Sequence, residues 1–279
     1  MKFILIIVFI ISTFQSLLSE QLLYKFVIYG DSQGGGVRHE KIIANIVSKK
    51  PDFVITVGDM VNIGGIDSLW KLFLKEIKPL SEIPYYPTIG NHETYGSKGW
   101  KILKKYFPAI YEMSGGKTYY TFSYPKNKPN SKFIILDSNI DYSNNSDQSK
   151  WLVNQLKSDC TGYLFVILHH PMYSPGRHSD NINLQKNLLP LFKKVKVSSF
   201  FSGHDHLYAR QKVNGVWHVV SGGGGGKLTF IRKNYYKDKK DFFALVTNHY
   251  LLLEVYSSKT LAFCFNNENK LVDSFVIER

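Results

Sequence analysis

The sequence predicts an α/β fold in which two packed sheets are flanked by helices. Predicted helices alternate with apolar strands over the first 200 residues, and strands dominate from there to the C-terminus. No linker rich in Pro and Ser divides the chain and no internal repeat occurs, so residues 20–279 are expected to form one domain. With 279 residues, 44% of them hydrophobic, the chain can build a large core.

The expected elements follow from the periodicity of the apolar residues. Continuous or alternating runs rich in β-branched and aromatic residues predict strands, whereas helices are predicted where apolar residues recur on one face, as Ile42, Ile43, Ile46 and Val47 do. Asp67 is the expected N-cap of the second helix, and residues 95–111 are a Gly-rich, aromatic region without an assigned element. Strands are expected at residues 22–29, 53–57, 85–89, 118–124, 132–137 (the last two as a hairpin), 163–168, 195–201, 216–220, 249–256, 260–265 and 271–277, and helices at 37–48, 67–78, 147–157 and 183–192.

Residues 1–19 have the pattern of a secretory signal peptide. Lys2 gives a short basic start, an apolar core of about ten residues follows, and the segment turns polar at Ser12. A membrane anchor needs about 20 apolar residues, so cleavage after Ser19 is favoured over an anchor. We therefore expect a secreted or periplasmic protein with no membrane span after cleavage.

The net charge of +13 indicates attraction to anionic substrates. The lysines are scattered along the chain and no Arg-rich helix is present, so no nucleic-acid partner is expected. Two cysteines, Cys160 and Cys264, can pair in an exported protein, and two separate buried thiols are the alternative. The sequence leaves that choice open.

Polar side chains stand at the ends of five predicted strands. The carboxyl ends of strands in α/β sheets form binding sites, so these side chains are expected to meet at one edge. Singly, each has a structural explanation, such as a turn residue, a helix cap or a core histidine. Together, two carboxylates, one amide and three imidazoles suit a pair of divalent or trivalent Fe, Mn or Zn ions. The six residues are Asp31, Asp59, Asn91, His169, His204 and His206.

Five short motifs containing these residues resemble the blocks of the calcineurin-like metallophosphoesterases. They occur in the family's order between residues 30 and 206, and the fourth block together with the glycine run 222–226 looks most like the purple acid phosphatase branch. The resemblance implies a four-layer α/β/β/α sandwich. The motifs are Gly30-Asp31-x-Gln33, Gly58-Asp59-x-x-Asn62, Gly90-Asn91-His92-Glu93, Val166-x-x-His169 and Gly203-His204-Asp205-His206.

The same resemblance implies a role for each motif residue. Asp31 and His206 would bind a first metal, and Asp59 would bridge the two metals. The second metal would be bound by the remaining three residues of the set, Asn91, His169 and His204. His92 would act as a general acid or as a donor that positions the phosphate.

Two residues depart from the family's pattern. Gln33 stands where the wider family has a histidine, and Asn62 stands where purple acid phosphatases have a tyrosine. The ligand shell of the first metal would then be completed by water, or by the side-chain carbonyl of Gln33 or Asn62. We expect weaker binding at the first site and no purple colour.

Further residues beside the motifs are candidates for binding the substrate. His170, Arg38 and His178 are the main ones, and His39, Tyr173 and Arg177 belong to the same segments. The glycine run 222–226 lacks the Gly-Lys-Ser/Thr ending of a phosphate-binding loop. It is expected to carry backbone close to the metals, where side chains would not fit.

The function expected is that of an exported, dinuclear-metal-dependent hydrolase of small phosphate esters, with a metal-bound hydroxide as nucleophile and His92 as general acid. One alternative is a phosphodiesterase that acts on nucleotides or phospholipid head groups. The other is a degenerate, non-catalytic binding module of the same fold.

Overall fold

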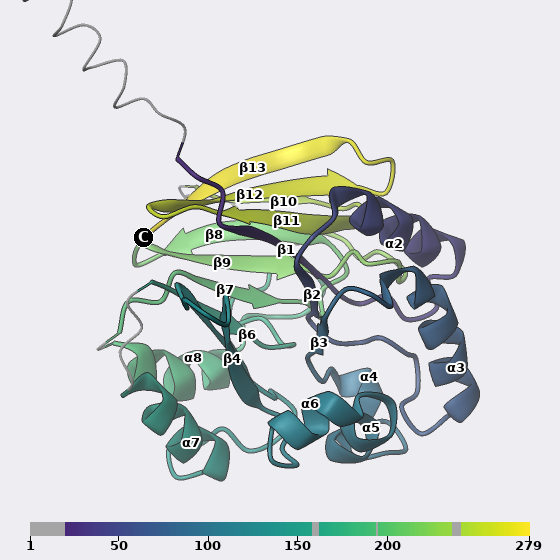
Figure 1. The fold of residues 1–279 in the computed structure, drawn as a ribbon, viewed down its shortest axis with the longest axis horizontal. Helices are drawn as coiled ribbons and strands as arrows, with labels where there is room; N and C mark the ends of the chain where they lie inside the picture. Colours follow the sequence, from purple (N-terminus) through teal and green to yellow (C-terminus); the bar gives the residue numbers. More distant parts are fainter. Residues whose placement is uncertain (1–19, 158–161, 194, 236–240) are drawn as a thin grey trace, which may run out of the picture.

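Two sheets pack face to face, and helices cover both outer faces (Figure 1). The computed structural model describes residues 20–157, 162–193, 195–235 and 241–279. The expected signal peptide and Cys160 lie outside the described residues. Cys264 is buried and makes no disulfide within the described residues.

The first sheet has the order β13-β12-β11-β1-β2-β3. Its three N-terminal strands run parallel, and the C-terminal strands continue the sheet antiparallel from β1. Parallel neighbours place their carboxyl ends at one edge, which is where the polar motifs begin. The strands are β1 (Tyr24–Tyr29), β2 (Phe53–Thr56), β3 (Tyr85–Pro87), β11 (His249–Val255), β12 (Lys259–Asn266) and β13 (Leu271–Glu278).

The second sheet has the order β10-β8-β9-β7-β6-β5-β4. Strands β5, β6, β7 and β9 are parallel, and β4 and β5 form the expected antiparallel hairpin. The carboxyl ends of β6 and β7 therefore also meet at one edge. The strands are β4 (Tyr120–Tyr124), β5 (Ser131–Ile135), β6 (Tyr163–Ile167), β7 (Ser199–Ser202), β8 (Tyr208–Val213), β9 (Val216–Ser221) and β10 (Phe243–Leu245).

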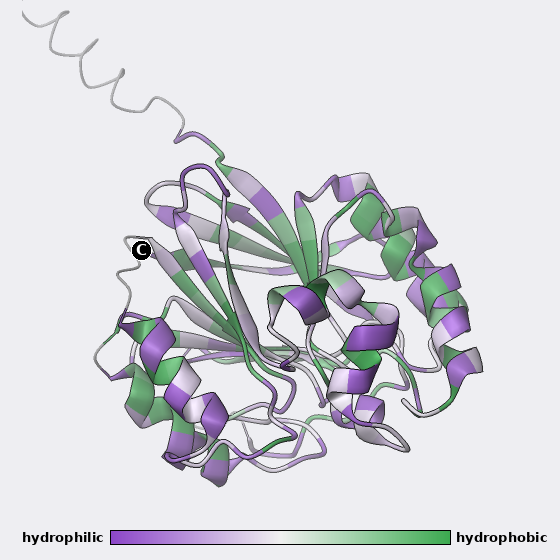
Figure 2. Cartoon of the chain, turned by 60° about the horizontal axis from the view of Figure 1, so that its bottom comes forward, coloured by the Kyte–Doolittle hydropathy of each residue, from purple (hydrophilic) through white to green (hydrophobic). Residues whose placement is uncertain are grey.

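Side-chain alternation along the strands divides the apolar residues between layers. In β1, Phe26 and Ile28 face the second sheet, whereas Val27 and Tyr29 face helix α2. Between the sheets, Phe26 and Phe133 meet edge to face with their centroids 5.2 Å apart. In Figure 2 the central strands are largely green, while the outer helices carry both green and purple residues.

The helices close the sandwich from both sides. Ile42, Ile43 and Ile46 of α2 pack on the outer face of the first sheet, and Leu152 of α7 and Leu184 of α8 pack on the outer face of the second. The four-layer α/β/β/α prediction is confirmed. The helices are α2 (Val37–Lys49), α3 (Asp67–Glu76), α4 (Asn91–Thr94), α5 (Gly99–Tyr106), α6 (Pro108–Met113), α7 (Asp147–Leu156), α8 (Ile182–Leu188) and the 3-10 turns η1 (Lys78–Leu80) and η2 (Leu189–Phe192).

Several local expectations were wrong. Helices α5 and α6 occupy most of residues 99–113, where no element was assigned, and strands β8 and β10 were not expected. Asp67 does not cap α3, because Ile66 occupies the N-cap position. The Asp67 carboxylate instead accepts bonds of 2.5 Å from Lys105 Nζ and the Tyr106 hydroxyl of α5. These partners are 38 and 39 residues away, so local sequence rules could not find them.

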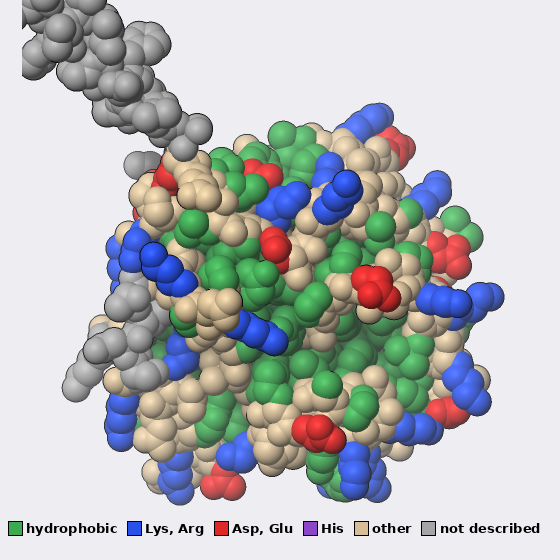
Figure 3. Space-filling model, in the orientation of Figure 1, with side chains coloured by type: hydrophobic (Ala, Val, Ile, Leu, Met, Phe, Trp, Pro, Cys, Tyr) green, Lys and Arg blue, Asp and Glu red, His purple; other side chains and the backbone are tan. Residues whose placement is uncertain are grey.

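Within the described ranges, no helix has both the length and the apolar composition needed to cross a bilayer. On the face seen in Figure 3, the Lys and Arg side chains stand singly or in small groups among Asp, Glu and apolar atoms. The expectation that no nucleic acid binds stays a prediction.

Candidate metal centre

Five strand ends from both sheets bring their polar side chains to one place. Asp31, Asp59 and His204 each follow a glycine and have positive φ angles of 58°, 52° and 68°. Residues other than glycine avoid this region, so the surrounding fold has to hold them there. At these positive φ angles the side chains turn out of the strand direction and toward one another. Residues held in this region are often found at functional sites.

His169 is the centre of one half of the cluster. Its Nδ1 donates to the Val57 carbonyl at 2.8 Å, because a carbonyl can only accept. In the neutral ring, Nε2 then carries a lone pair. That nitrogen lies 3.0 Å from Asn91 Oδ1, 3.2 Å from His204 Nδ1 and 3.3 Å from Asp59 Oδ2. Acceptor atoms this close to one another need a proton or a metal ion among them.

The other half contains His206 and Asp31. His206 Nδ1 donates to the Lys227 carbonyl at 2.7 Å, which leaves Nε2 to face Asp31 Oδ1 at 3.5 Å. Asp31 also accepts the backbone N–H of His204, at 2.9 and 3.1 Å. Because Asp31, Asp59 and His169 are all buried and their ligand atoms lie within 4.8 Å of one another, this half can hold a metal ion too.

Burial dominates the electrostatics of the cluster. It raises the pKa of Asp31 well above the usual range. Burial works to lower the pKa of His169, but the Asp59 and Asp31 carboxylates and the Val57 carbonyl together outweigh it and raise that pKa to about 10. The pKa of His204 falls to about 2, first through burial and then through His169. The cluster therefore demands positive charge beside Asp59, which a proton or a metal ion can supply.

Gln33 and Asn62, the two departures, lie in different environments. Gln33 is buried, and its Nε2 lies 3.4 Å from Asp59 Oδ2 and 3.3 Å from His206 Nε2. Its Oε1 is buried without a hydrogen-bond partner. Asn62 is exposed, and its side chain lies beside Gly34. Of these two side chains only Gln33 touches the cluster, and its buried, unpaired oxygen is suited to binding a cation.

A cavity of about 520 Å³ opens over the cluster. His92 lies at its wall: the ring Nδ1 contacts the Asn62 carbonyl at 2.7 Å, and Nε2 lies 3.9 Å from Asp59 Oδ2. The contact through Nδ1 holds the His92 ring at the cavity wall. The lining residues are Asp59, Asn91, His92, Tyr95, Arg177, His178, His204, His206, Lys227, Leu228, Thr229 and Phe230.

The candidate substrate-binding residues divide into two groups. His178 and Arg177 line the cavity, and the His178 ring lies on His204 with centroids 3.9 Å apart. His170 packs on His204 at 4.4 Å, contacts Ser138 Oγ at 2.8 Å and lines a neighbouring cavity of about 400 Å³. These three lie next to the cluster.

The remaining candidates point elsewhere. Arg38 donates to the Gly225 carbonyl at 2.8 Å and is not among the residues that line the cavity. His39 is fully buried and contacts Glu76 of α3 at 2.6 Å. Tyr173 packs edge to face on His218. Arg38 and His39 thus brace the glycine run and α2 rather than the cavity wall.

The glycine run passes close to the cluster, as expected. A Cβ on Gly222 would lie 2.9 Å from Asp31 Oδ2, and one on Gly226 would lie 3.1 Å from His206 Nδ1. Gly226 N–H also donates to the Asp31 carbonyl at 2.9 Å. Side chains here would push the ligand residues apart.

Glu93 is buried beside the site. The sequence motif contains this residue but assigned it no role. Its carboxylate accepts the backbone N–H groups of Asp59, Met60 and Gly90, each at 2.8 Å, and that of Val61 at 3.3 Å. Burial and the nearby Asp59 charge raise the pKa of Glu93 to about 7. Glu93 thereby ties the end of β2 to the end of β3. The sequence does carry a signal for this capping role, because Glu93 stands at the third position of the helix that follows Gly90.

Asp205 plays a similar part on the other side of the cavity. It is fully buried and accepts the backbone N–H groups of Gly176 at 3.1 Å and His178 at 3.2 Å, together with the Ser174 hydroxyl. These bonds hold the segment that places His178 on His204.

Replacing Glu93 by Gln should destabilise the metal-free fold by about 1–3 kcal/mol, because the amide NH₂ would face backbone donors and leave some of them unpaired. Urea denaturation at pH 8 with a chelator measures the change. Glu112→Gln on the exposed surface of α6 is the matched control and should leave the midpoint unchanged. Equal stability of the two variants would contradict this role for Glu93.

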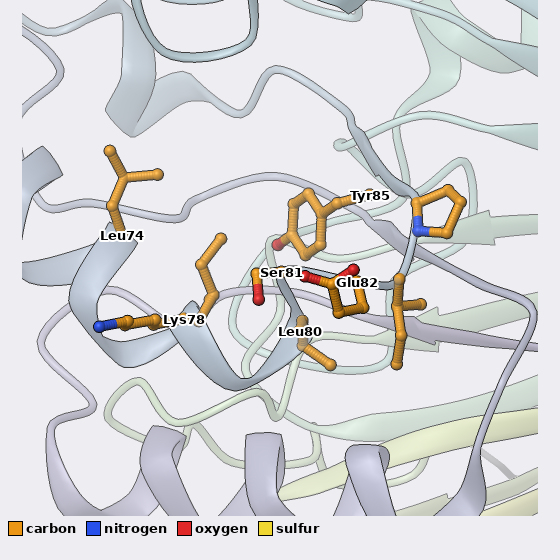
Figure 4. Close-up of a pocket in the computed structure, with 9 residues that line it drawn as sticks. Leu74, Lys78, Leu80, Ser81, Glu82 and Tyr85 are labelled. Atoms are coloured by element: carbon orange, nitrogen blue, oxygen red, sulfur yellow. The ribbon is translucent and has the colours of Figure 1, made fainter.

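A third cavity, of about 590 Å³, lies between α3, η1 and β3 and shares no residue with the cluster (Figure 4). Its walls are mainly apolar, with Leu74, Ile77, Leu80 and Tyr85 among them. It contains none of the histidines, so the chemistry belongs to the cavity over the cluster.

Residues 24–208 match the family model of the calcineurin-like phosphoesterases, which is more than half of the chain. The chain therefore belongs to this family of metallophosphoesterases. Within it, the chain is similar to the purple acid phosphatase branch.

Three relatives illustrate that similarity. Mouse (Mus musculus) tartrate-resistant acid phosphatase type 5 is 26% identical over 210 residues, covering 66% of this chain and 64% of that protein. Probable purple acid phosphatase 20 of Arabidopsis thaliana is 29% identical over 202 residues, covering 67% and 46%. The purple acid phosphatase PPD1 from yellow lupin (Lupinus luteus) seeds has a TM-score of 0.71 at 21% identity, covering 94% and 54%. The chain thus spans less than two thirds of the length of these relatives.

Proposed function

We propose that the chain is an exported hydrolase of phosphate monoesters that works with two metal ions. The observation that carries this proposal is the convergence of Asp59 Oδ2, Asn91 Oδ1 and His204 Nδ1 on His169 Nε2, each within 3.3 Å of it. Family membership and the acid phosphatases among the relatives support it.

In this proposal the Asp59 carboxylate would be a ligand of both metal ions. Asp31 and His206 hold the first, and Asn91, His169 and His204 hold the second. A mixed set of oxygen and imidazole ligands suits Fe, Mn or Zn. The backbone carbonyls of Val57 and Lys227 support the assignment, because each fixes the tautomer of one histidine with its Nε2 turned inward.

When bound, a pair of metals supplies an ionised water as nucleophile and neutralises phosphate oxygens. The chain's own residues do the rest. His178 and Arg177 at the cavity wall orient the phosphate, and His170 supports His204 from behind. His92, held through Nδ1 by the Asn62 carbonyl, gives a proton from Nε2 to the leaving oxygen.

Gln33 substitutes for the missing ligands of the first site, and Asn62 does not. The unpaired Gln33 Oε1 supports this, since rotating the amide turns that oxygen toward Asp59 and His206. Gln33→Leu should therefore weaken the first metal by about 10–100-fold and leave the second bound. Calorimetric metal titration measures both sites. Asn62→Leu is the control, and an equal loss in that variant would contradict the distinction.

The iron-loaded protein should lack an intense visible absorption band, because no tyrosine stands at position 62 to give a tyrosinate-to-iron transition. A visible spectrum of the protein with two irons bound tests this. A strong band near that of a purple protein would show that another tyrosine is a ligand.

The proposed function is tested by metal content together with turnover. Two metals per chain and faster hydrolysis of mono- than of bis-nitrophenyl phosphate are expected. The reverse preference would favour the phosphodiesterase alternative. Protein without bound metal and without turnover would favour the non-catalytic module.

Export by cleavage after Ser19 is part of the proposal. Glu20 is already bonded to the folded domain, because its carboxylate accepts the backbone N–H of Ser258 at 2.5 Å. Residues 20–279 are proposed as the mature domain. The mass of the protein recovered outside the cytoplasm should correspond to a chain that begins at Glu20, whereas a retained leader would overturn this.

A further inference from the structure

The cavity over the metal cluster has aromatic walls in addition to its polar floor. Tyr95 and Phe230 line it and are 49% and 60% exposed. Among the described residues, these two and Trp100 are the exposed aromatic side chains. Beside the cluster, the two exposed rings offer apolar surface that a bound group can cover.

Both aromatic residues are tied to proposed metal ligands. The Tyr95 hydroxyl accepts a bond of 2.9 Å from Asn91 Nδ2, and its ring lies 4.9 Å from the His92 ring. Tyr95 is therefore fixed next to the proposed second metal and the proposed proton donor.

Phe230 is connected to the other half of the cluster. Thr229 N–H, one residue before it, donates to the His206 carbonyl at 3.0 Å. The same segment receives the His206 Nδ1 bond through Lys227 at 2.7 Å. The backbone next to Phe230 is thus held at the half of the cluster that contains His206, while Tyr95 is held at the half that contains Asn91.

We propose that this cavity selects phosphate esters that carry a planar aromatic group, such as a nucleoside monophosphate, and that Tyr95 and Phe230 determine this specificity. The inference rests on the proposed function, because the phosphate is taken to bind at the metals. The cavity volume of about 520 Å³ suits a ligand larger than phosphate alone. Exposed Arg177 and Lys227 at the wall favour an anionic ligand.

The test compares adenosine 5′-monophosphate with ribose 5-phosphate. Both lose phosphate from the same primary alcohol, so the chemistry is matched and only the aromatic base differs. The metal-loaded enzyme should prefer the nucleotide in kcat/KM by about tenfold, mainly through KM, since stacking contributes this much for one base. Phe230→Ala should bring the ratio close to one.

Two further variants separate ring contact from metal positioning. Tyr95→Phe keeps the ring and should keep the preference, whereas Tyr95→Ala should lose it. Trp100→Ala, exposed but outside the cavity lining, is the control and should keep the tenfold ratio. Phenyl phosphate, assayed in the same variants, reports whether an aromatic ring attached directly to the ester is also recognised.

The outcomes distinguish the inference from the proposed function. Hydrolysis of both substrates at a ratio near one, or a ratio unchanged in Phe230→Ala, would overturn the inference and leave the phosphatase function standing. Absence of hydrolysis would count against the function. Equilibrium dialysis of both ligands with the metal-loaded protein would then decide the inference, with equal affinities overturning it.

Discussion

Replacing Asp59 by asparagine should strip the protein of both metal ions. The Asp59 carboxylate is the proposed bridge, and its Oδ2 lies 3.3 Å from His169 Nε2. An amide removes the negative charge from both sites at once, so affinity should fall more than about 100-fold at each. Elemental analysis after dialysis should fall from about two metals per chain to near zero.

The backbone contacts at this position allow a clean comparison. Asp59 Oδ1 accepts the backbone N–H of His92 at 2.9 Å, and an asparagine Oδ1 can still accept it. The metal-free fold should therefore survive, as a circular dichroism spectrum in chelator will report. Asp141→Asn, at an exposed loop position, is the matched control and should retain both metals. Two metals retained by the Asp59 variant would refute the bridging role.

Replacing His92 by alanine should lower kcat by about 10²–10⁴-fold on an alkyl phosphate while both metals stay bound. The side chain is not in the proposed ligand set, and its backbone N–H continues to donate to Asp59. Stopped assays on glycerol phosphate, together with metal analysis, measure the two quantities.

The leaving group distinguishes two roles for His92. A nitrophenolate leaves readily without a proton, so a general acid should matter much less for nitrophenyl phosphate than for an alkyl phosphate. Equal losses on both substrates would instead identify a donor that positions the phosphate. Unchanged turnover of the alkyl ester would exclude both roles.

The strands that carry the site were predictable because each combines a continuous apolar run with a polar ending. Phe53 to Val57 followed by Gly58-Asp59 is such a case, and burial on both faces of a parallel strand requires that run. The helices α5 and α6 were missed because they are short and stabilised by packing of Ile102, Leu103 and Ile110 on the shared core.

The split between Gln33 and Asn62 could not be predicted. Both carry a side-chain amide in the first two motifs, and the sequence treated them as equal substitutes. Folding buries Gln33 between Asp59 and His206 and leaves Asn62 exposed beside Gly34. Which amide reaches the cluster depends on how the two loops after β1 and β2 pack.

The sequence alone determined the layered fold, the order of the strand ends and the six polar side chains that converge there, because periodicity and strand-end position are local properties. Only the tertiary structure decided what orients and surrounds them. The carbonyls of Val57 and Lys227 and the buried carboxylate of Glu93 bind residues distant in sequence. The exposed rings of Tyr95 and Phe230 come from distant parts of the chain to line one cavity. Such contacts form only when both sheets have packed, so no local pattern records them.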